Sequence, residues 1–124
     1  MAKSLGSQAE TTAARISTDG KHSAVLMSEA AGHSGYQASI CVQGHQNFDG
    51  RAGRVMGSVG GMVQEVVAES WPGQSLVEAA HECIHSWRQS SGHWAGVAGS
   101  HRHYGYDMKR GASGVWYATG LFAN

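Results

Sequence analysis

The strongest hydrophobic pattern of the chain lies in residues 75–94, SLVEAAHECIHSWRQSSGHW. Apolar residues recur there every three or four positions, which is the spacing of one face of an α-helix. These positions are Leu76, Ala80, Ile84 and Trp87. Ser75 and Glu78 fit a capping box at the start of this helix, in which each side chain bonds the other residue's backbone N–H. We expect the helix to end at Gly92, which suits a left-handed exit, and to leave His93 just beyond it.

Two weaker helical patterns precede this segment. Residues 23–43 predict a helix in two pieces, because Gly32 and Gly35 weaken its middle. A short helix is predicted to begin at Arg51. On the far side of the main helix, residues 93–99 carry no clear periodicity, and we expect a loop there.

Strand-like alternation is clearest near the C-terminus. Residues 101–108 and 115–122 alternate in character and are rich in aromatic residues, and the glycine-containing stretch 109–114 between them predicts a turn. These segments together predict a terminal antiparallel hairpin. Residues 62–68 form an apolar run that contains Glu65. Because burying an unpaired charge is costly, Glu65 must face a cavity, a partner or a metal. The alternative is a structural carboxylate that backbone N–H groups or Arg54 satisfy.

Size and composition limit the class of protein. The 124 residues suit one domain at residues 21–124, preceded by a polar segment at residues 1–20. Nine basic residues balance nine acidic ones, which argues against nucleic-acid binding. No apolar run is long enough for a transmembrane segment, and the N-terminus lacks the hydrophobic region of a secretory signal. Cys41 and Cys83 leave both one disulfide and two free thiols open.

One helical motif suggests a zinc protease. His81, Glu82 and His85 form a literal H-E-x-x-H, in which two histidines four residues apart can bind zinc while the glutamate acts as general base. No further glutamate follows Glu82 in the chain, so the usual third ligand is missing. The alternative interpretation is a solvent-facing histidine pair on an amphipathic helix.

The remaining histidines and tryptophans carry weaker signals. His101 and His103 lie two residues apart on a predicted strand and so point to one face of it. We expect them to be exposed there, and the alternative is that they extend a binding cleft. The four tryptophans are more typical of a core than of a ligand platform, and Trp71 is expected to anchor a turn. Trp94 lies next to His93 and is the tryptophan expected to line a groove.

Four motifs resemble those of bacterial CAP domains, the SCP-domain superfamily of cysteine-rich secretory proteins, antigen five and the plant pathogenesis-related-one proteins. They are HSGYQASICVQGHQNFDGR at residues 33–51, QEVVAES at 64–70, SWRQSSGHW at 86–94 and WYATGLFAN at 116–124. In order, they are similar to the family's first helix and histidine loop, its G-E-N-hydrophobic motif, its W-x-x-S-P-G-H segment and its last strand. The resemblance implies an α+β fold, a three-layer α-β-α sandwich, which here would end in the C-terminal hairpin.

The resemblance also implies a binding cleft. By motif match, His45, His93 and Glu65 would face each other across it, with Trp94 alongside. Two neutral imidazoles and a carboxylate can hold zinc with one position left open, so zinc or another divalent cation is the implied cofactor. The second acidic residue of the family's four-residue site falls near Ser90, so that the set is incomplete in this chain.

The function that we predict is non-enzymatic: an extracellular or surface-located binding module for a protein, lipid or other surface ligand. A second hypothesis is a zinc-dependent hydrolase that uses either the cleft or the pair His81 and His85. A third is a structural or decoration subunit, either a homo-oligomer or part of a larger assembly such as a phage virion. That third hypothesis rests on the polar start of the chain, which a neighbouring subunit would hold in place.

Overall fold

The computed structural model describes residues 21–124, and the segment at residues 1–20 lies outside this range. A four-stranded mixed sheet forms the middle of the fold. The elements, in chain order, are β1 (Lys21–His22), α2 (Ala24–Ile40), α3 (Phe48–Val59), β2 (Val63–Glu69), α4 (Leu76–Arg88), α5 (Ser91–Ala98), β3 (His103–Arg110) and β4 (Trp116–Ala123).

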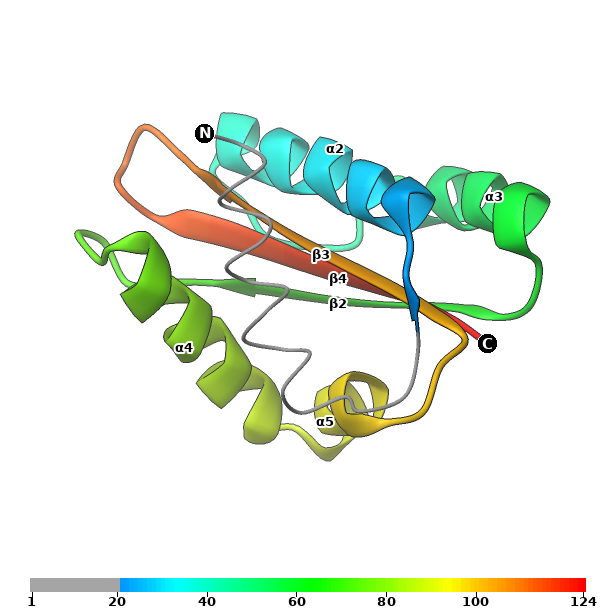
Figure 1. The fold of residues 1–124 in the computed structure, drawn as a ribbon. Coiled ribbons are helices and arrows are strands. Elements are labelled where there is room, and N and C mark those ends of the chain that lie inside the picture. The colour runs from blue at the N-terminus through cyan, green and yellow to red at the C-terminus, as the bar shows by residue number, and fades with distance from the viewer. Residues whose placement is uncertain (1–20) are drawn as a thin grey trace.

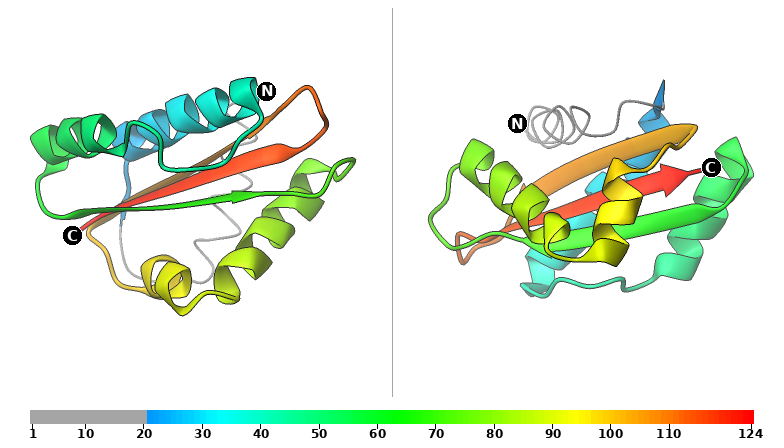
Figure 2. Two further views of the ribbon diagram at one scale, coloured as in Figure 1. Left: turned by 180° about the vertical axis from the view of Figure 1, so that it is seen from behind. Right: turned by 90° about the horizontal axis from the view of Figure 1, so that it is seen from below.

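The helices cover the sheet on both faces. Helices α2 and α3 lie on one face, and α4 and α5 lie on the other (Figures 1 and 2). The strand order is β1-β3-β4-β2. β3 and β4 pair antiparallel, as do β4 and β2, whereas the short β1 runs parallel to β3. The α+β class, the three layers and the terminal hairpin predicted from the sequence are therefore confirmed.

Each helical layer has its own apolar core against the sheet. The core under α2 and α3 is small and contains Leu26, Ala30, Val55, Leu121 and Ala123. The core under α4 and α5 is larger, and its aromatic members include Trp87, Tyr106, Trp116 and Phe122. Every residue of the interior strand β4 is buried, because helices cover both faces of the sheet (Figure 1).

Helix α2 is continuous, although two pieces were expected. Ser23 caps it through a hydrogen bond from the Leu26 N–H, and Gly32 and Gly35 both lie inside the helix. The reason is tertiary: the helix packs closely on β3. A Cβ on Gly105 of β3 would lie 2.4 Å from the backbone nitrogen of Met27. Such packing outweighs the weak helix propensity of two glycines.

The capping box at the start of α4 is present as predicted. Glu78 N–H donates to the Ser75 hydroxyl at 3.2 Å, and Ser75 N–H donates to the Glu78 carboxylate at 2.9 Å. The backbone hydrogen bond from Ser75 lowers the pKa of Glu78 below its usual value, because it stabilises the charged carboxylate.

The expected loop after α4 is wrong, because a second helix, α5, begins there. The Ser90 hydroxyl accepts a hydrogen bond from the His93 N–H at 3.3 Å and so acts as a helix N-cap. Gly92 consequently lies within the first turn of α5 instead of forming a left-handed exit. Helix α3 also differs from expectation, since it begins at Phe48, three residues before Arg51.

Candidate functional site

Several of the candidate site residues lie on or beside β2, which forms one edge of the sheet. Successive side chains of a strand point to opposite faces, so β2 offers one row of residues to the α2–α3 layer and another to the α4–α5 layer. Glu65 faces the first of these layers, where it meets the loop that joins α2 to α3. Val66, its neighbour, packs in the core beneath α4 and α5.

Glu65 is the centre of a buried cluster of charged and polar groups. Its side chain is 1% exposed and that of Arg51 is 4% exposed. Arg51 donates from Nε to Oε2 at 2.7 Å and from Nη2 to Oε1 at 2.8 Å, which makes a two-pronged ion pair. His45 Nδ1 lies 2.9 Å from Oε1. The partner of the buried carboxylate is thus Arg51, whereas Arg54, three residues further along α3, pairs with Glu29 on the surface.

A second histidine, His33 of α2, borders the same cluster. Its Nε2 lies 2.6 Å from the Gly44 carbonyl oxygen and 4.0 Å from Glu65 Oε1. Burial lowers the pKa of His33 below its usual value, because the imidazolium would lose its hydration there. A neutral His33 can donate from Nε2 to the Gly44 carbonyl, and so it ties the middle of the α2–α3 loop to α2.

The structure does not bring His93 and Trp94 to this cluster. Both residues lie in the first turn of α5, on the face of the sheet opposite to α2 and α3. Trp94 packs against the core under α4 and α5, and the Arg88 guanidinium lies 5.0 Å from the centre of its ring. The cleft expected from His45, Glu65 and His93 together is therefore not assembled, because the sheet separates the two layers that carry them.

The contacts of Glu65 are those of a buried ion pair and not those of a metal site. Both carboxylate oxygens already accept hydrogen bonds from Arg51, and a cation next to the guanidinium would be repelled. In the part of the chain that the structure describes, no group of three or more His, Cys, Asp or Glu side chains is placed to hold a metal ion. Zinc or another divalent cation thus stays a prediction, and binding at Glu65 would require Arg51 to move away.

The H-E-x-x-H residues lie on the outer side of α4. His81 and His85 are both exposed, as the alternative interpretation of a solvent-facing pair predicts. Cys83 between them is buried, and burial together with the nearby carboxylates of Glu82 and Glu69 raises the pKa of its thiol to about 12. Cys83 and Cys41 are both free thiols.

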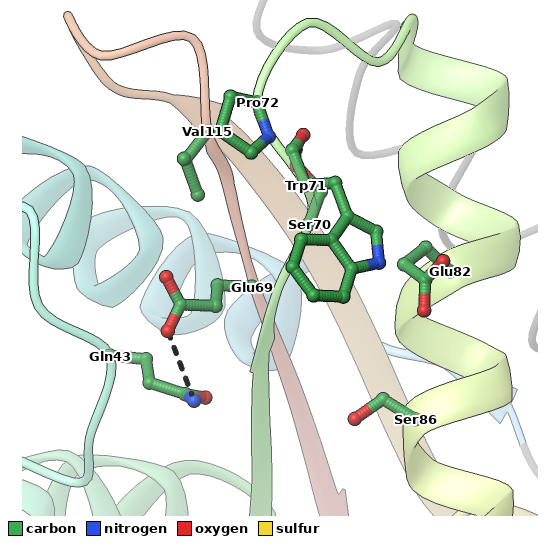
Figure 3. Close-up of a pocket in the computed structure, with 8 residues that line it drawn as sticks. All are labelled: Gln43, Glu69, Ser70, Trp71, Pro72, Glu82, Ser86 and Val115. Carbon is green, nitrogen blue, oxygen red and sulfur yellow. Dashed lines mark hydrogen bonds between the residues drawn. The ribbon is translucent and has the colours of Figure 1, made fainter.

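A pocket of about 470 Å³ opens on the outer side of β2, where the strand ends. Figure 3 shows it in close-up, with the Trp71 indole between the side chains of Glu69 and Glu82. Its lining comes from both helical layers and from the turn after β2: Gln43, Glu69, Ser70, Trp71, Pro72, Glu82, Ser86 and Val115. The volume falls within the range of ligand-binding clefts.

Trp71 does not anchor its turn by burial, as we had expected, since it is 67% exposed. The turn is held instead by hydrogen bonds between the side chains of Ser70 and Gln74 and the backbone. Trp71 N–H donates to the Gln74 side chain at 3.0 Å, and the Ser70 hydroxyl donates to the Trp71 carbonyl at 2.9 Å. The same hydroxyl accepts from the Trp116 N–H at 2.9 Å, which fastens the turn to β4. A fixed backbone therefore presents a large aromatic ring to solvent.

The sequence interpretation missed this pocket and also misplaced His101. His101 is 8% exposed, with Nε2 lying 2.6 Å from the Gly96 carbonyl and Nδ1 lying 2.5 Å from the Asn124 side chain. It stacks on Phe122 at a ring-centre distance of 4.5 Å. The expectation of an exposed His101 is therefore wrong, and the residue instead joins α5 to the C-terminus.

Comparison with known proteins supports the architecture. No family model and no curated protein matches the chain. Among solved structures, an outer surface protein from Borrelia burgdorferi is similar, with a TM-score of 0.68 and 14% sequence identity. The match covers 97% of this chain and 88% of that protein. At this identity the likeness concerns the fold alone. None of the helices in residues 21–124 is long and apolar enough to cross a bilayer.

Proposed function

We propose that this chain is a non-enzymatic binding module that engages a protein partner through the pocket beside Trp71. The observation that carries the proposal is the exposed indole on a fixed turn at the mouth of a pocket. Tryptophan is enriched at binding hot spots, because one side chain supplies a large contact area. Because the backbone of its turn is already held by hydrogen bonds, docking costs less conformational entropy than ordering a loose loop would.

The buried cluster at Glu65 supports a binding function over hydrolysis. A general base needs a carboxylate oxygen that can accept a proton from a bound water. Both oxygens of Glu65 instead accept hydrogen bonds from Arg51, and one of them also meets His45. The cluster is well suited to fix the α2–α3 loop, and this loop contributes Gln43 to the pocket.

A location outside the cell or on the surface of a cell or particle is part of the proposal. Its support is the resemblance of the sequence motifs to CAP domains, together with a similar fold in a protein described as an outer surface protein. The hypothesis of assembly into a larger particle depends on the N-terminal segment, and residues 1–20 lie outside the described range. The binding role through the pocket is the one that the described residues support.

Selection of peptide ligands would test the proposal. Peptides selected from a random display library on the immobilised chain should lose binding to the Trp71→Ala variant. The matched control is Tyr36→Ala, because Tyr36 is also exposed (42%) but lies on α2, outside the pocket lining. Selected peptides that bind Trp71→Ala and the unmodified chain equally well would contradict the proposed function.

A further inference from the structure

Two carboxylates flank the exposed indole of Trp71. Glu69 comes from the last position of β2, and Glu82 comes from α4. Both residues line the pocket, and Figure 3 shows their side chains on either side of the ring. Elements from different parts of the chain thus bring two negative charges and one aromatic face to the same opening.

No basic side chain neutralises these charges within residues 21–124. The described ion pairs of that range join other carboxylates, those of Glu29, Glu65 and Asp107, to their partners. Glu69 accepts a hydrogen bond from the neutral amide of Gln43 at 3.4 Å. Burial is the main cause of the raised pKa of the Cys83 thiol, and the nearby carboxylates of Glu82 and Glu69 add to it.

A cation is the group that such a pocket would recognise. Aromatic ring faces attract ammonium and guanidinium groups through the quadrupole of the ring. Carboxylates add electrostatic complementarity to a cation, and two negative charges in one pocket disfavour an anionic occupant. The long aliphatic stem of lysine or arginine can also pack along the indole while the charged end reaches a carboxylate.

We propose that this pocket binds a lysine or arginine side chain of the protein partner against the Trp71 ring, where the carboxylates of Glu69 and Glu82 on either side of the ring attract its positive charge (Figure 3). The inference rests on the proposed function, because it names the chemistry of the partner at the same site. Trp71 supplies the ring face, Glu69 and Glu82 supply charge, and the Ser86 hydroxyl on α4 offers a further acceptor at the pocket wall.

Titration by NMR would test the inference on the whole chain labelled with ¹⁵N. The probes are Nα-acetyl-lysine amide and Nα-acetyl-arginine amide, and the neutral control is Nα-acetyl-norleucine amide. The cationic probes should shift the backbone amide signals of Trp71, Glu82 and Ser86 in a saturable manner, and norleucine should not. Equal shifts with all three probes would overturn the inference.

Variants should then show which groups bind the cation. Trp71→Ala should weaken lysine binding by about two- to fivefold, and Glu69→Gln and Glu82→Gln should each weaken it by about two- to fivefold. Glu29→Gln removes one negative charge from α2, outside the pocket lining, and should leave binding unchanged. Lysine binding that is unaffected in all three pocket variants would overturn the inference.

Two further outcomes separate this inference from the proposed function. Display peptides that depend on Trp71 but carry neither lysine nor arginine would overturn the inference and leave the proposed function standing. Saturable lysine binding at the pocket, with selected peptides that do not depend on Trp71, would support the inference and contradict the proposed function. A separate titration with calcium chloride tests for a metal ion. If calcium shifts the backbone amide signals of Trp71, Glu82 and Ser86 and the lysine probe does not, the pocket binds a metal ion and the inference is overturned.

Discussion

Arg51 and Arg54 lie three residues apart on α3, yet their ion pairs differ in burial. The Arg51–Glu65 pair is almost completely buried, whereas the Arg54 side chain is 60% exposed in its pair with Glu29. A buried charge that loses its partner keeps the full cost of its lost hydration. A surface pair is screened by water and contributes little.

The two arginines therefore make a matched test of the buried cluster. Arg51→Ala should lower the free energy of unfolding by about 3–5 kcal/mol, because it leaves the Glu65 carboxylate buried without its partner. Arg54→Ala should lower it by less than about 1 kcal/mol. Urea denaturation followed by circular dichroism measures both values. Similar small losses for the two variants would show that Glu65 is not held by Arg51.

At the scale of the elements, the close contact of α2 with β3 depends on a residue without a side chain. A Cβ on Gly105 would meet the backbone of Met27 at 2.4 Å, which is far inside normal contact distance. Backbone atoms in a packed helix cannot yield as a flexible side chain can. Gly32, on α2 itself, has open space around the position where a Cβ would lie.

Alanine at these two glycines should change stability in opposite directions. Gly105→Ala should cost about 1–3 kcal/mol or more, since α2 must shift away from the sheet. Gly32→Ala should stabilise the protein by roughly 0.5–1 kcal/mol, because alanine favours the helix and restricts the unfolded chain. Thermal unfolding of both variants checks the prediction, and a stabilised Gly105→Ala variant would refute the close packing.

The sequence predicted the elements whose signals are local. The Ser75–Glu78 capping box located the start of α4, and alternation of aromatic and β-branched residues located β4. Helix α5 was missed, because Ser90 can equally end one helix or cap the next. The interpretation of Glu65 as a charge that needs a partner was sound, but the residue that pairs with it depends on the tertiary fold.

The predicted cleft was wrong and the pocket at Trp71 was not predicted, because both depend on how the helical layers pack on the sheet. Motifs placed His45 and His93 in one cleft, but no sequence pattern states on which face of the sheet α5 packs. The exposure of Trp71 likewise depends on how Ser70 and Gln74 hold the turn against β4 and Trp116. Only the folded chain brings Gln43, Glu69 and Glu82 around one opening.

At the scale of the whole molecule, the pocket lies where both helical layers meet the edge of the sheet. Gln43 belongs to the α2–α3 side, and Ser86 belongs to α4 on the other side. A ligand seated in the pocket must therefore affect residues of both layers at once. A ligand on another exposed apolar position, such as Tyr36 or Ile40 of α2, would affect one layer alone.

Mapping a selected peptide onto the ¹⁵N-labelled chain by chemical-shift changes is the most direct measurement of the central claim. The account predicts the largest changes at Gln43, Trp71 and Ser86, in both layers around the pocket, with the signals of α2 near Tyr36 unchanged. Changes confined to α2, or to the exposed face of α4 around His81, would contradict it.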